Sequence, residues 1–269
     1  MPNPAIVIPV HNHELTLEET ISLKQCQKIL GAFPIFLLHP IGMNTDAYQL
    51  IFPKLQHLEI SPKLMSSISA YNKLMISPLI FDALKQHSHL LIHEPDAIVL
   101  KNDLIYWCKK DYDYIGAPWF LSEDASDQRL KETGNFGLSL LKVDTANKIF
   151  RDNPRWYTSA MILRDLLRSI RGRGNFQRVL AAVGGAGKVF SASTLYNDHC
   201  DIFWSYLIPK IYSRFRKAPP ESAIYFSWEK NPEKCFKICG GEMPFGIHAW
   251  KKHNYVFLHP LLMNAGVEI

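Results

Sequence analysis

The length, composition and charge of the chain exclude several classes of protein. With 269 residues, 47% of them hydrophobic and 20% charged, the chain is too apolar for global disorder and long enough for a well-filled core. A formal net charge of +5 fits a phosphate-bearing substrate or an anionic surface, but it is too small to indicate nucleic-acid binding.

The apolar pattern predicts strands that alternate with helices in the first half of the chain. Residues 5–10 form a short β-rich run. Thr16 and Glu19 form a capping-box signal for a helix that starts near Leu17, and Gly31 ends it. Further elements follow in order: strand 35–38, helix 78–86, strand 90–93, helix 104–109, strand and turn 112–118, strand 137–142 and a helix through 150. This alternation predicts an α/β fold with a mostly parallel central sheet flanked by helices.

The N-terminus and the cysteines indicate the compartment. Residues 1–4 contain no basic region and lead directly into a strand, so we expect no secretory signal. No apolar run approaches the ~18 residues of a membrane-spanning helix. The cysteines are odd in number and scattered, which fits a reducing cytosol. We therefore expect a cytoplasmic protein, with peripheral contact at the inner face of the membrane as an extension of that prediction.

Two motifs in the second half have ordinary explanations. Residues 184–188 resemble a phosphate-binding loop, but Ala182 and Val189 occupy positions where that pattern needs Gly and Ser or Thr, so a turn is predicted. Four arginines form a basic helix end, which a solvated face explains. Contact with an anionic lipid or polymer acceptor is the alternative. These are Arg164, Arg168, Arg171 and Arg173.

The most informative segment is Glu94-Pro95-Asp96, at the end of the apolar run 90–93. Pro95 favours extended geometry at Glu94, and at strand spacing two residues that lie two apart share a face. Ligands of open α/β sheets bind beyond the carboxyl ends of the strands. Two carboxylates there suit a hard divalent cation together with substrate phosphates. The alternative is a pair of solvated loop acids.

Several further segments carry a family resemblance. The most specific is Tyr112 to Trp119, which contains Tyr-Asp-Tyr-Ile-Gly-Ala-Pro. The others lie at residues 5–10, 22–23, 70–75, 94–96, 106–108, 134–140, 201–203 and 244–250. Together they span nearly the whole chain in order. In these segments the chain resembles a bacterial group of GT-A-type glycosyltransferase-like domains.

The resemblance implies a single GT-A-like, Rossmann-like domain over residues 1–269, with a nucleotide-sugar half at about 1–120 and an acceptor half at about 121–269. In such enzymes a carboxylate pair at a strand end holds Mn²⁺ or Mg²⁺ against the diphosphate of a nucleotide-sugar. That role falls to Glu94 and Asp96 here. Relatives usually have Gln at the first position, so this pair is more acidic.

The resemblance also suggests further donor-side residues. His248 is the candidate for a third ligand, because a neutral imidazole suits Mn²⁺ better than Mg²⁺. The alternative is a hydrogen-bonded structural histidine. Lys73 is a candidate phosphate or ribose contact, and a helix-surface lysine is its alternative. The residues expected to bind the nucleotide are Val10, His11, Asn72 and Lys73.

On the acceptor side, an inverting transfer needs a general base within hydrogen-bond reach of the acceptor hydroxyl. The resemblance suggests Asp201, with the nearby Asp198 as the second candidate, while a helix N-cap is the structural alternative for Asp201. Trp119 and Trp250 could stack on sugars, although buried packing explains either ring equally well. The residues expected to bind the acceptor or sugar are Asp113, Trp119, Gly134, Asn135 and Trp250.

The expected function is therefore a metal-dependent glycosyltransferase. It would move a sugar from a nucleotide-diphosphate sugar to a glycan or lipid-linked glycan in bacterial surface-polysaccharide or glycoconjugate synthesis. A catalytically silent glycan- or nucleotide-binding module is the main alternative. A sugar nucleotidyltransferase is disfavoured, because residues 11–15 lack the Gly-rich loop that this class carries after its first strand.

Overall fold

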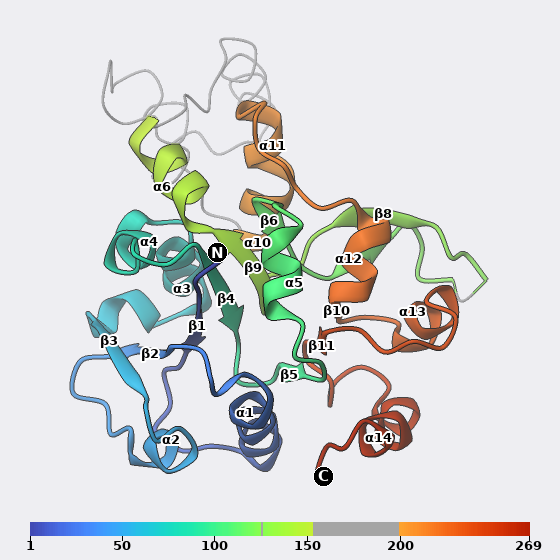
Figure 1. The fold of residues 1–269 in the computed structure, drawn as a ribbon, viewed down its shortest axis with the longest axis horizontal. Helices are drawn as coiled ribbons and strands as arrows, with labels where there is room; N and C mark the ends of the chain where they lie inside the picture. The colour runs from blue at the N-terminus through green and yellow to red at the C-terminus, as the bar shows by residue number, and fades with distance from the viewer. Residues whose placement is uncertain (125, 153–198) are drawn as a thin grey trace, which may run out of the picture.

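The computed structural model describes residues 1–124, 126–152 and 199–269. The strands of its central sheet are β1 (Pro4–Pro9), β2 (Ile35–Pro40), β3 (Gln56–Ile60), β4 (His89–His93), β6 (Tyr114–Ile115) and β9 (Leu138–Lys142). They lie in the order β3-β2-β1-β4-β9-β6 (Figure 1). The first four are parallel, and β9 pairs antiparallel with both β4 and β6. The predicted α/β class with a mostly parallel central sheet is therefore confirmed.

The central strands are buried on both faces. On β4, Leu90 and Ile92 belong to one hydrophobic cluster and Leu91 to another. All six residues of β1 are buried, and residues 5–8 alternate between the same two clusters. A strand buried on both faces has a continuous apolar sequence, which is why the sequence pattern located β1, β2 and β4.

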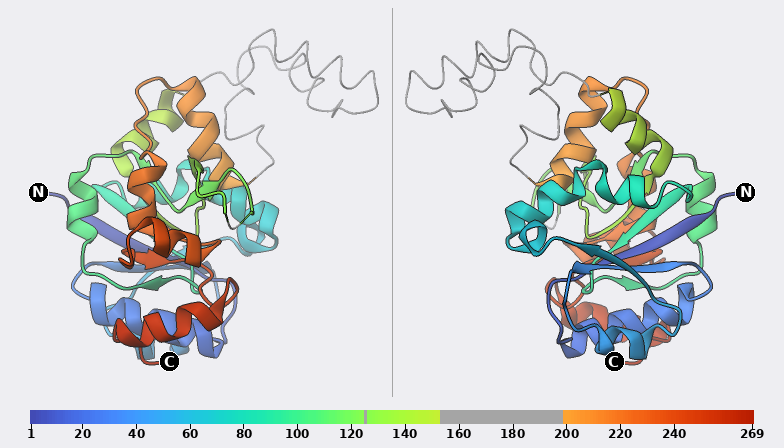
Figure 2. Two further views of the ribbon diagram at one scale, coloured as in Figure 1. Left: turned by 90° about the vertical axis from the view of Figure 1, so that its right-hand side faces the viewer. Right: turned by 90° about the vertical axis from the view of Figure 1, so that its left-hand side faces the viewer.

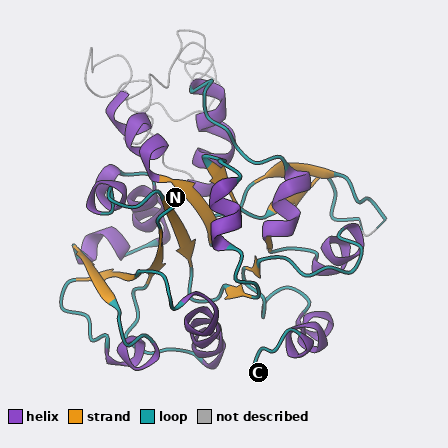
Figure 3. Cartoon of the chain, viewed as in Figure 1, coloured by secondary structure: helices purple, strands orange, loops and turns teal. Residues whose placement is uncertain are grey.

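Helices cover both faces of this sheet. The helical segments are α1 (Leu17–Leu30), α2 (Asp46–Ile51), the 3₁₀ turn η1 (Pro62–Met65), α3 (Ile68–Met75), α4 (Pro78–Ala83), α5 (Leu104–Lys109), α6 (Val143–Asp152), α10 (Cys200–Ile202), the π-helical turn η2 (Phe203–Leu207), α11 (Ile208–Ile211), α12 (Pro220–Phe226), α13 (Pro232–Ile238) and α14 (Tyr255–Asn264). Residues of α3, α4 and α6 join the cluster that contains Leu90, and residues of α1, α2, α5 and α12 join the cluster that contains Leu91. Figure 2 accordingly shows α3 and α5 on opposite sides of the molecule, and Figure 3 shows the helices around the sheet.

Two small sheets complete the described fold. One pairs β7 (Pro118–Phe120) with β8 (Leu130–Thr133). The other contains β5 (Ile98–Val99), β10 (Ser227–Trp228) and β11 (Gly246–Ile247), with β11 between the other two. Ile247 pairs with Ile98, four residues after Glu94. The second small sheet thus brings residue 248 beside the segment that contains the predicted acid pair.

The local expectations are met in part. The capping box of α1 is confirmed, because Thr16 and Glu19 each accept a hydrogen bond from the backbone of the other. The predicted helix 78–86 ends at Ala83. The predicted strand and turn at 112–118 appear as β6, which ends at Ile115, followed by Gly116, where an added Cβ would lie 2.1 Å from the Asn135 carbonyl oxygen.

Some sequence predictions fall outside the described structure. The glycine-rich turn at 184–188, the four arginines between 164 and 173, and Asp198 all lie outside the described residues. In the described parts of the chain, no helix is long and apolar enough to cross a bilayer. The division into a nucleotide-sugar half and an acceptor half stays a prediction.

The packing of β4 leads to a first testable expectation. Leu91 is fully buried, whereas Leu50 on α2 is 86% exposed. Leu91→Ala should lower the free energy of unfolding by about 2–5 kcal/mol, because it removes buried methyl groups and leaves a cavity. Leu50→Ala is the matched control and should change it by less than about 0.5 kcal/mol. Urea denaturation measures both, and equal stability of the two variants would contradict this account of the core.

Candidate functional site

The acid pair lies on a turn at the carboxyl end of β4. The Ala97 amide donates to the Glu94 carbonyl at 2.9 Å, which closes a four-residue turn with Pro95 in its second position. The strand ends at His93, as predicted, but the expected strand spacing between Glu94 and Asp96 is not found. Proline is favoured at the second position of such a turn, because its fixed φ matches the φ that this position requires. The turn, rather than strand alternation, determines how the two carboxylates lie.

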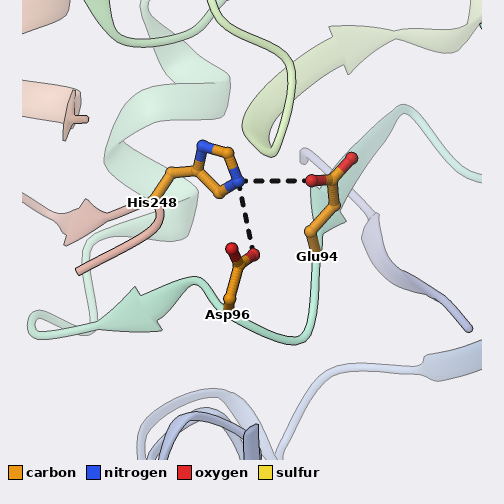
Figure 4. A group of neighbouring side chains, drawn as sticks. All are labelled: Glu94, Asp96 and His248. Carbon is orange, nitrogen blue, oxygen red and sulfur yellow. Dashed lines mark ion pairs between the residues drawn. The ribbon is translucent and has the colours of Figure 1, made fainter. Parts of the chain in front are cut away.

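His248 completes a cluster with these two carboxylates. Its Nε2 lies 3.2 Å from Glu94 Oε2 and 3.3 Å from Asp96 Oδ1 (Figure 4). One ligand atom from each of the three residues lies within 4.8 Å of the others. The backbone amide of His248 donates to the Trp228 carbonyl at 2.8 Å, so the small sheet also fixes its main chain. Three residues predicted separately to bind a metal are thus neighbours, while their role as ligands stays a prediction.

A close backbone approach supports the imidazole from one side. A Cβ added to Gly137 would lie 2.2 Å from His248 Nε2, so only glycine leaves room for the ring. The Gly137 carbonyl accepts from the Glu94 amide at 2.8 Å. Asn135, at a left-handed φ of 34°, accepts from the Gly137 amide through its side chain. The loop before β9 therefore forms one wall of the site.

Carboxylates surround the imidazole on both of its nitrogen-bearing edges. Glu229 Oε1 lies 3.6 Å from His248 Nδ1, whereas Glu94 and Asp96 contact the other ring nitrogen. Burial opposes the charged imidazole, but contacts with these three acids outweigh it and raise the pKa of His248 well above its ordinary value of 6.5. Burial alone would raise the pKa of Asp96, yet the facing imidazole lowers it, and the same holds for Glu229.

Tyr71 is a site residue that the sequence did not single out. Its hydroxyl donates to Glu94 Oε1 at 2.7 Å, while the other oxygen of that carboxylate faces His248. Burial, followed by the charge of Glu94, raises the pKa of Tyr71, so the hydroxyl stays protonated and able to donate. Roles were predicted instead for the two residues that follow it, Asn72 and Lys73. Glu229 was also missed, and its only signal is an acid directly after Phe226-Ser227-Trp228.

A pocket of about 440 Å³ opens beside the acid pair. Val10 and His11 line it from the end of β1, as predicted for a nucleotide wall, and Val10 is buried whereas His11 is exposed. The segment that leads into α3 forms another part of the wall. The lining residues are 9–12, Glu19, Tyr48, 65–68, Tyr71 and 94–96.

The other two nucleotide candidates do not line this pocket. Asn72 is buried and occupied by structural hydrogen bonds, donating to the Ile68 carbonyl and accepting from the Cys200 amide. It ties α3 to α10. Lys73 is exposed on α3 and is not among the pocket residues. The structure thus supports the structural alternative for Asn72 and the surface alternative for Lys73.

Asp113 lies at the wrong edge of the sheet for an acceptor contact. Its carbonyl accepts from the Lys142 amide, and Lys142 pairs with His89, the first residue of β4. Glu94 follows the last residue of that strand, so the length of β4 separates the two acids. The Asp113 carboxylate accepts from the Arg216 amide at 2.7 Å. Its predicted acceptor role is wrong because these hydrogen bonds commit it to the opposite edge.

The two tryptophans have different surroundings. Trp250 is fully buried, and its indole nitrogen donates to Ser22 Oγ at 2.8 Å. It offers no face to a sugar, so the stacking prediction is wrong for Trp250 and the packing alternative holds. Trp119 is half-buried, and its ring lies against Gly134, where an added Cβ would be 2.2 Å away. Trp119, Gly134 and Asn135 therefore adjoin the loop that reaches His248, and their acceptor role stays a prediction.

Asp201 lies in the first turn of α10. His199 is the residue before the helix, so the N-cap alternative does not hold for Asp201, whose side chain accepts from the Ile202 amide. Burial, then the charge of Asp201, then that of Glu94 raise the pKa of the Cys200 thiol. The Cys200 amide donates to the Asn72 side chain, so the start of α10 lies beside α3, the helix that carries Tyr71.

The imidazole gives the metal-free protein a defined pH dependence. The folded pKa of His248 is raised, so its stabilising contribution is complete below about pH 6.5 and is lost as pH rises through the folded pKa. In EDTA, the melting temperature should fall from pH 6.5 towards pH 9. His248→Gln should flatten this part of the profile. An unchanged slope in that variant would show that other groups cause it.

Solved structures resemble the chain only distantly. Core-mannan synthase A (CmsA/Ktr4) from Aspergillus fumigatus, in its Mn/GDP form, is 12% identical at a TM-score of 0.42; the match covers 56% of this chain and 63%, less than two thirds, of that one. An active-site mutant of LgtC is 9% identical at a TM-score of 0.48, and the match covers 91% of this chain and 86% of that one. A glycosyltransferase involved in glycosylation of the major capsid of PBCV-1 is 9% identical at a TM-score of 0.43. That match covers 97% of this chain and 100% of the other. Because these similarities are so weak, neither an activity nor a residue role can be assigned to this chain from them.

The sequence itself has a clearer relationship. No curated protein matches the chain. The family model described as "Protein of unknown function (DUF5672)" matches residues 54–248, which is most of the chain. The matched stretch begins before β3 and includes Glu94, Asp96 and His248. The chain therefore belongs to the DUF5672 family.

Proposed function

We propose that this protein is a metal-dependent glycosyltransferase that uses a nucleotide-diphosphate sugar as donor. The observation that carries the proposal is the cluster of Glu94, Asp96 and His248, whose two acids line the 440 Å³ pocket. Pocket and cluster lie at the carboxyl ends of β1 and β4, where α/β sheets bind ligands. The acceptor expected from the family resemblance is a glycan or lipid-linked glycan.

The donor atoms fit a divalent cation of the Mn²⁺ or Mg²⁺ type. Two carboxylates and one imidazole supply hard oxygen ligands and one nitrogen, a set that favours Mn²⁺. The side chains of His248 and Glu94 are only 12% and 26% exposed, whereas that of Asp96 is 50% exposed and faces the open side. When bound, the cation would stabilise negative charge on the leaving diphosphate.

The charge of the pocket explains why a nucleotide would need that cation. Glu19, Glu94 and Asp96 line it, and no lysine or arginine does so among the described residues. A diphosphate placed there alone would face like charges at short range. Val10 and His11 offer a wall for the base and ribose. Donor binding should therefore depend on the metal far more than in a pocket lined by basic side chains.

Asp201 is our proposal for the general base. Two contacts support a position near the acid pair: the Cys200 amide donates to Asn72 on α3, and Tyr71 of the same helix donates to Glu94. As an ionised carboxylate it could accept the proton of an acceptor hydroxyl while that oxygen attacks the sugar. A dedicated base implies direct displacement and hence inversion at the anomeric carbon.

Metal-dependent donor binding is the first test of the function. Nucleotide-sugars and nucleoside diphosphates should raise the melting temperature only when Mn²⁺ or Mg²⁺ is present, and a ligand at 100 times its Kd adds about 2.7 kcal/mol. Asp96→Asn should abolish this effect. Asp82→Asn, on the exposed side of α4, is the matched control and should retain it. Metal-independent stabilisation, or full stabilisation of Asp96→Asn, would contradict the proposal.

Transfer itself tests the base. Asp201→Asn should lower kcat by at least ~100-fold, at the low end of general-base catalysis, while donor affinity stays near the wild-type value. NMR of the product should show an inverted anomeric configuration. A retained configuration or near-normal turnover would reject Asp201 as the base. Donor binding without either transfer or hydrolysis in the wild type would indicate a binding module instead.

A further inference from the structure

The second nitrogen of His248 faces an acid that has no role in the site so far. Glu229 Oε1 lies 3.6 Å from Nδ1, and both side chains are largely buried, at 16% and 12% exposure. Within the described residues, Nδ1 is buried and has no hydrogen-bond partner. Glu229 is the charged group that lies nearest to Nδ1 in position to accept a hydrogen bond from it.

Backbone pairing fixes the two residues relative to each other. Glu229 follows β10 and His248 follows β11, and these strands pair in parallel with Trp228 opposite Ile247. The His248 amide also donates to the Trp228 carbonyl at 2.8 Å. The two side chains therefore leave adjacent strand ends at the same level, and a movement of well under 1 Å would bring Oε1 and Nδ1 within hydrogen-bond distance.

Geometry excludes a role for Glu229 on the same cation. Figure 4 shows Nε2 directed towards Glu94 and Asp96, with Nδ1 on the other edge of the ring. An ion held by Nε2 lies on the far side of the imidazole from Glu229. The acid can therefore act on that ion only through the ring.

We propose that Glu229 is a positioning residue for His248, an inference that rests on the proposed metal site. A histidine binds a metal through a nitrogen lone pair, so Nε2 must be unprotonated and Nδ1 must carry the proton. A carboxylate opposite Nδ1 selects this tautomer, holds the ring plane and makes Nε2 a stronger donor. Mutation of such partners typically costs 10–100-fold in metal affinity.

Mn²⁺ titration without any nucleotide tests this role. Glu229→Ala should bind Mn²⁺ about 10–100-fold more weakly than wild type. Glu229→Gln should lie between them, because its amide oxygen still accepts from Nδ1 but carries no charge. Glu242→Gln is the control: this acid pairs with Lys101 on the surface and should leave the affinity unchanged. The free Mn²⁺ signal in electron paramagnetic resonance gives the dissociation constants.

A spectroscopic readout separates positioning from simple loss of structure. Wild type should show nitrogen modulation from His248 in the spin echo of bound Mn²⁺, His248→Ala should lose it, and Glu229→Ala should weaken it, with Glu229→Gln restoring it. Wild-type affinity and modulation in both Glu229 variants would overturn the positioning role alone. Absence of Mn²⁺ binding in wild type would instead remove the proposed metal site, and this inference with it.

Discussion

The pairing of β11 with β5 and β10 is the constraint on which the site depends. Each of these strands has two residues, yet together they place His248 between the turn after β4 and the residue after β10. The three segments are far apart in sequence, so no local structure would hold them together. Their ordering costs conformational entropy. A shared cluster of buried side chains offsets that cost, and it includes Ile98, Trp228, Ile247 and Trp250.

The same arrangement concentrates negative charge around one ring. Like charges at short range raise the free energy of the folded state unless a cation or a proton compensates them. In the metal-free protein the imidazolium supplies that compensation, because its two edges reach all three acids. Gly137 makes this possible, since any larger residue would displace the ring from the position where it faces Glu94 and Asp96.

The sequence predicted the parts of this site that local chemistry specifies. Continuous apolar runs located β1 and β4, and the two acids directly after β4 were predicted as a carboxylate pair. Edge strand β3, with its exposed or half-buried residues, has no such run and was missed. Tyr71 and Glu229 could not be found, because their roles arise from tertiary contacts with Glu94 and His248. Trp250 and Asp113 were misassigned since aromatic and acidic residues look alike in sequence whether they pack a core or bind a ligand.

The hydrogen bond from Tyr71 has a consequence for ion selectivity. One oxygen of Glu94 accepts from this hydroxyl, and the other oxygen is the one that faces His248. Calcium favours six to eight oxygen ligands and often takes both oxygens of a carboxylate, whereas magnesium and manganese accept single oxygens in a compact octahedron. At the proposed metal site, the Tyr71 hydrogen bond would therefore disfavour calcium relative to magnesium and manganese.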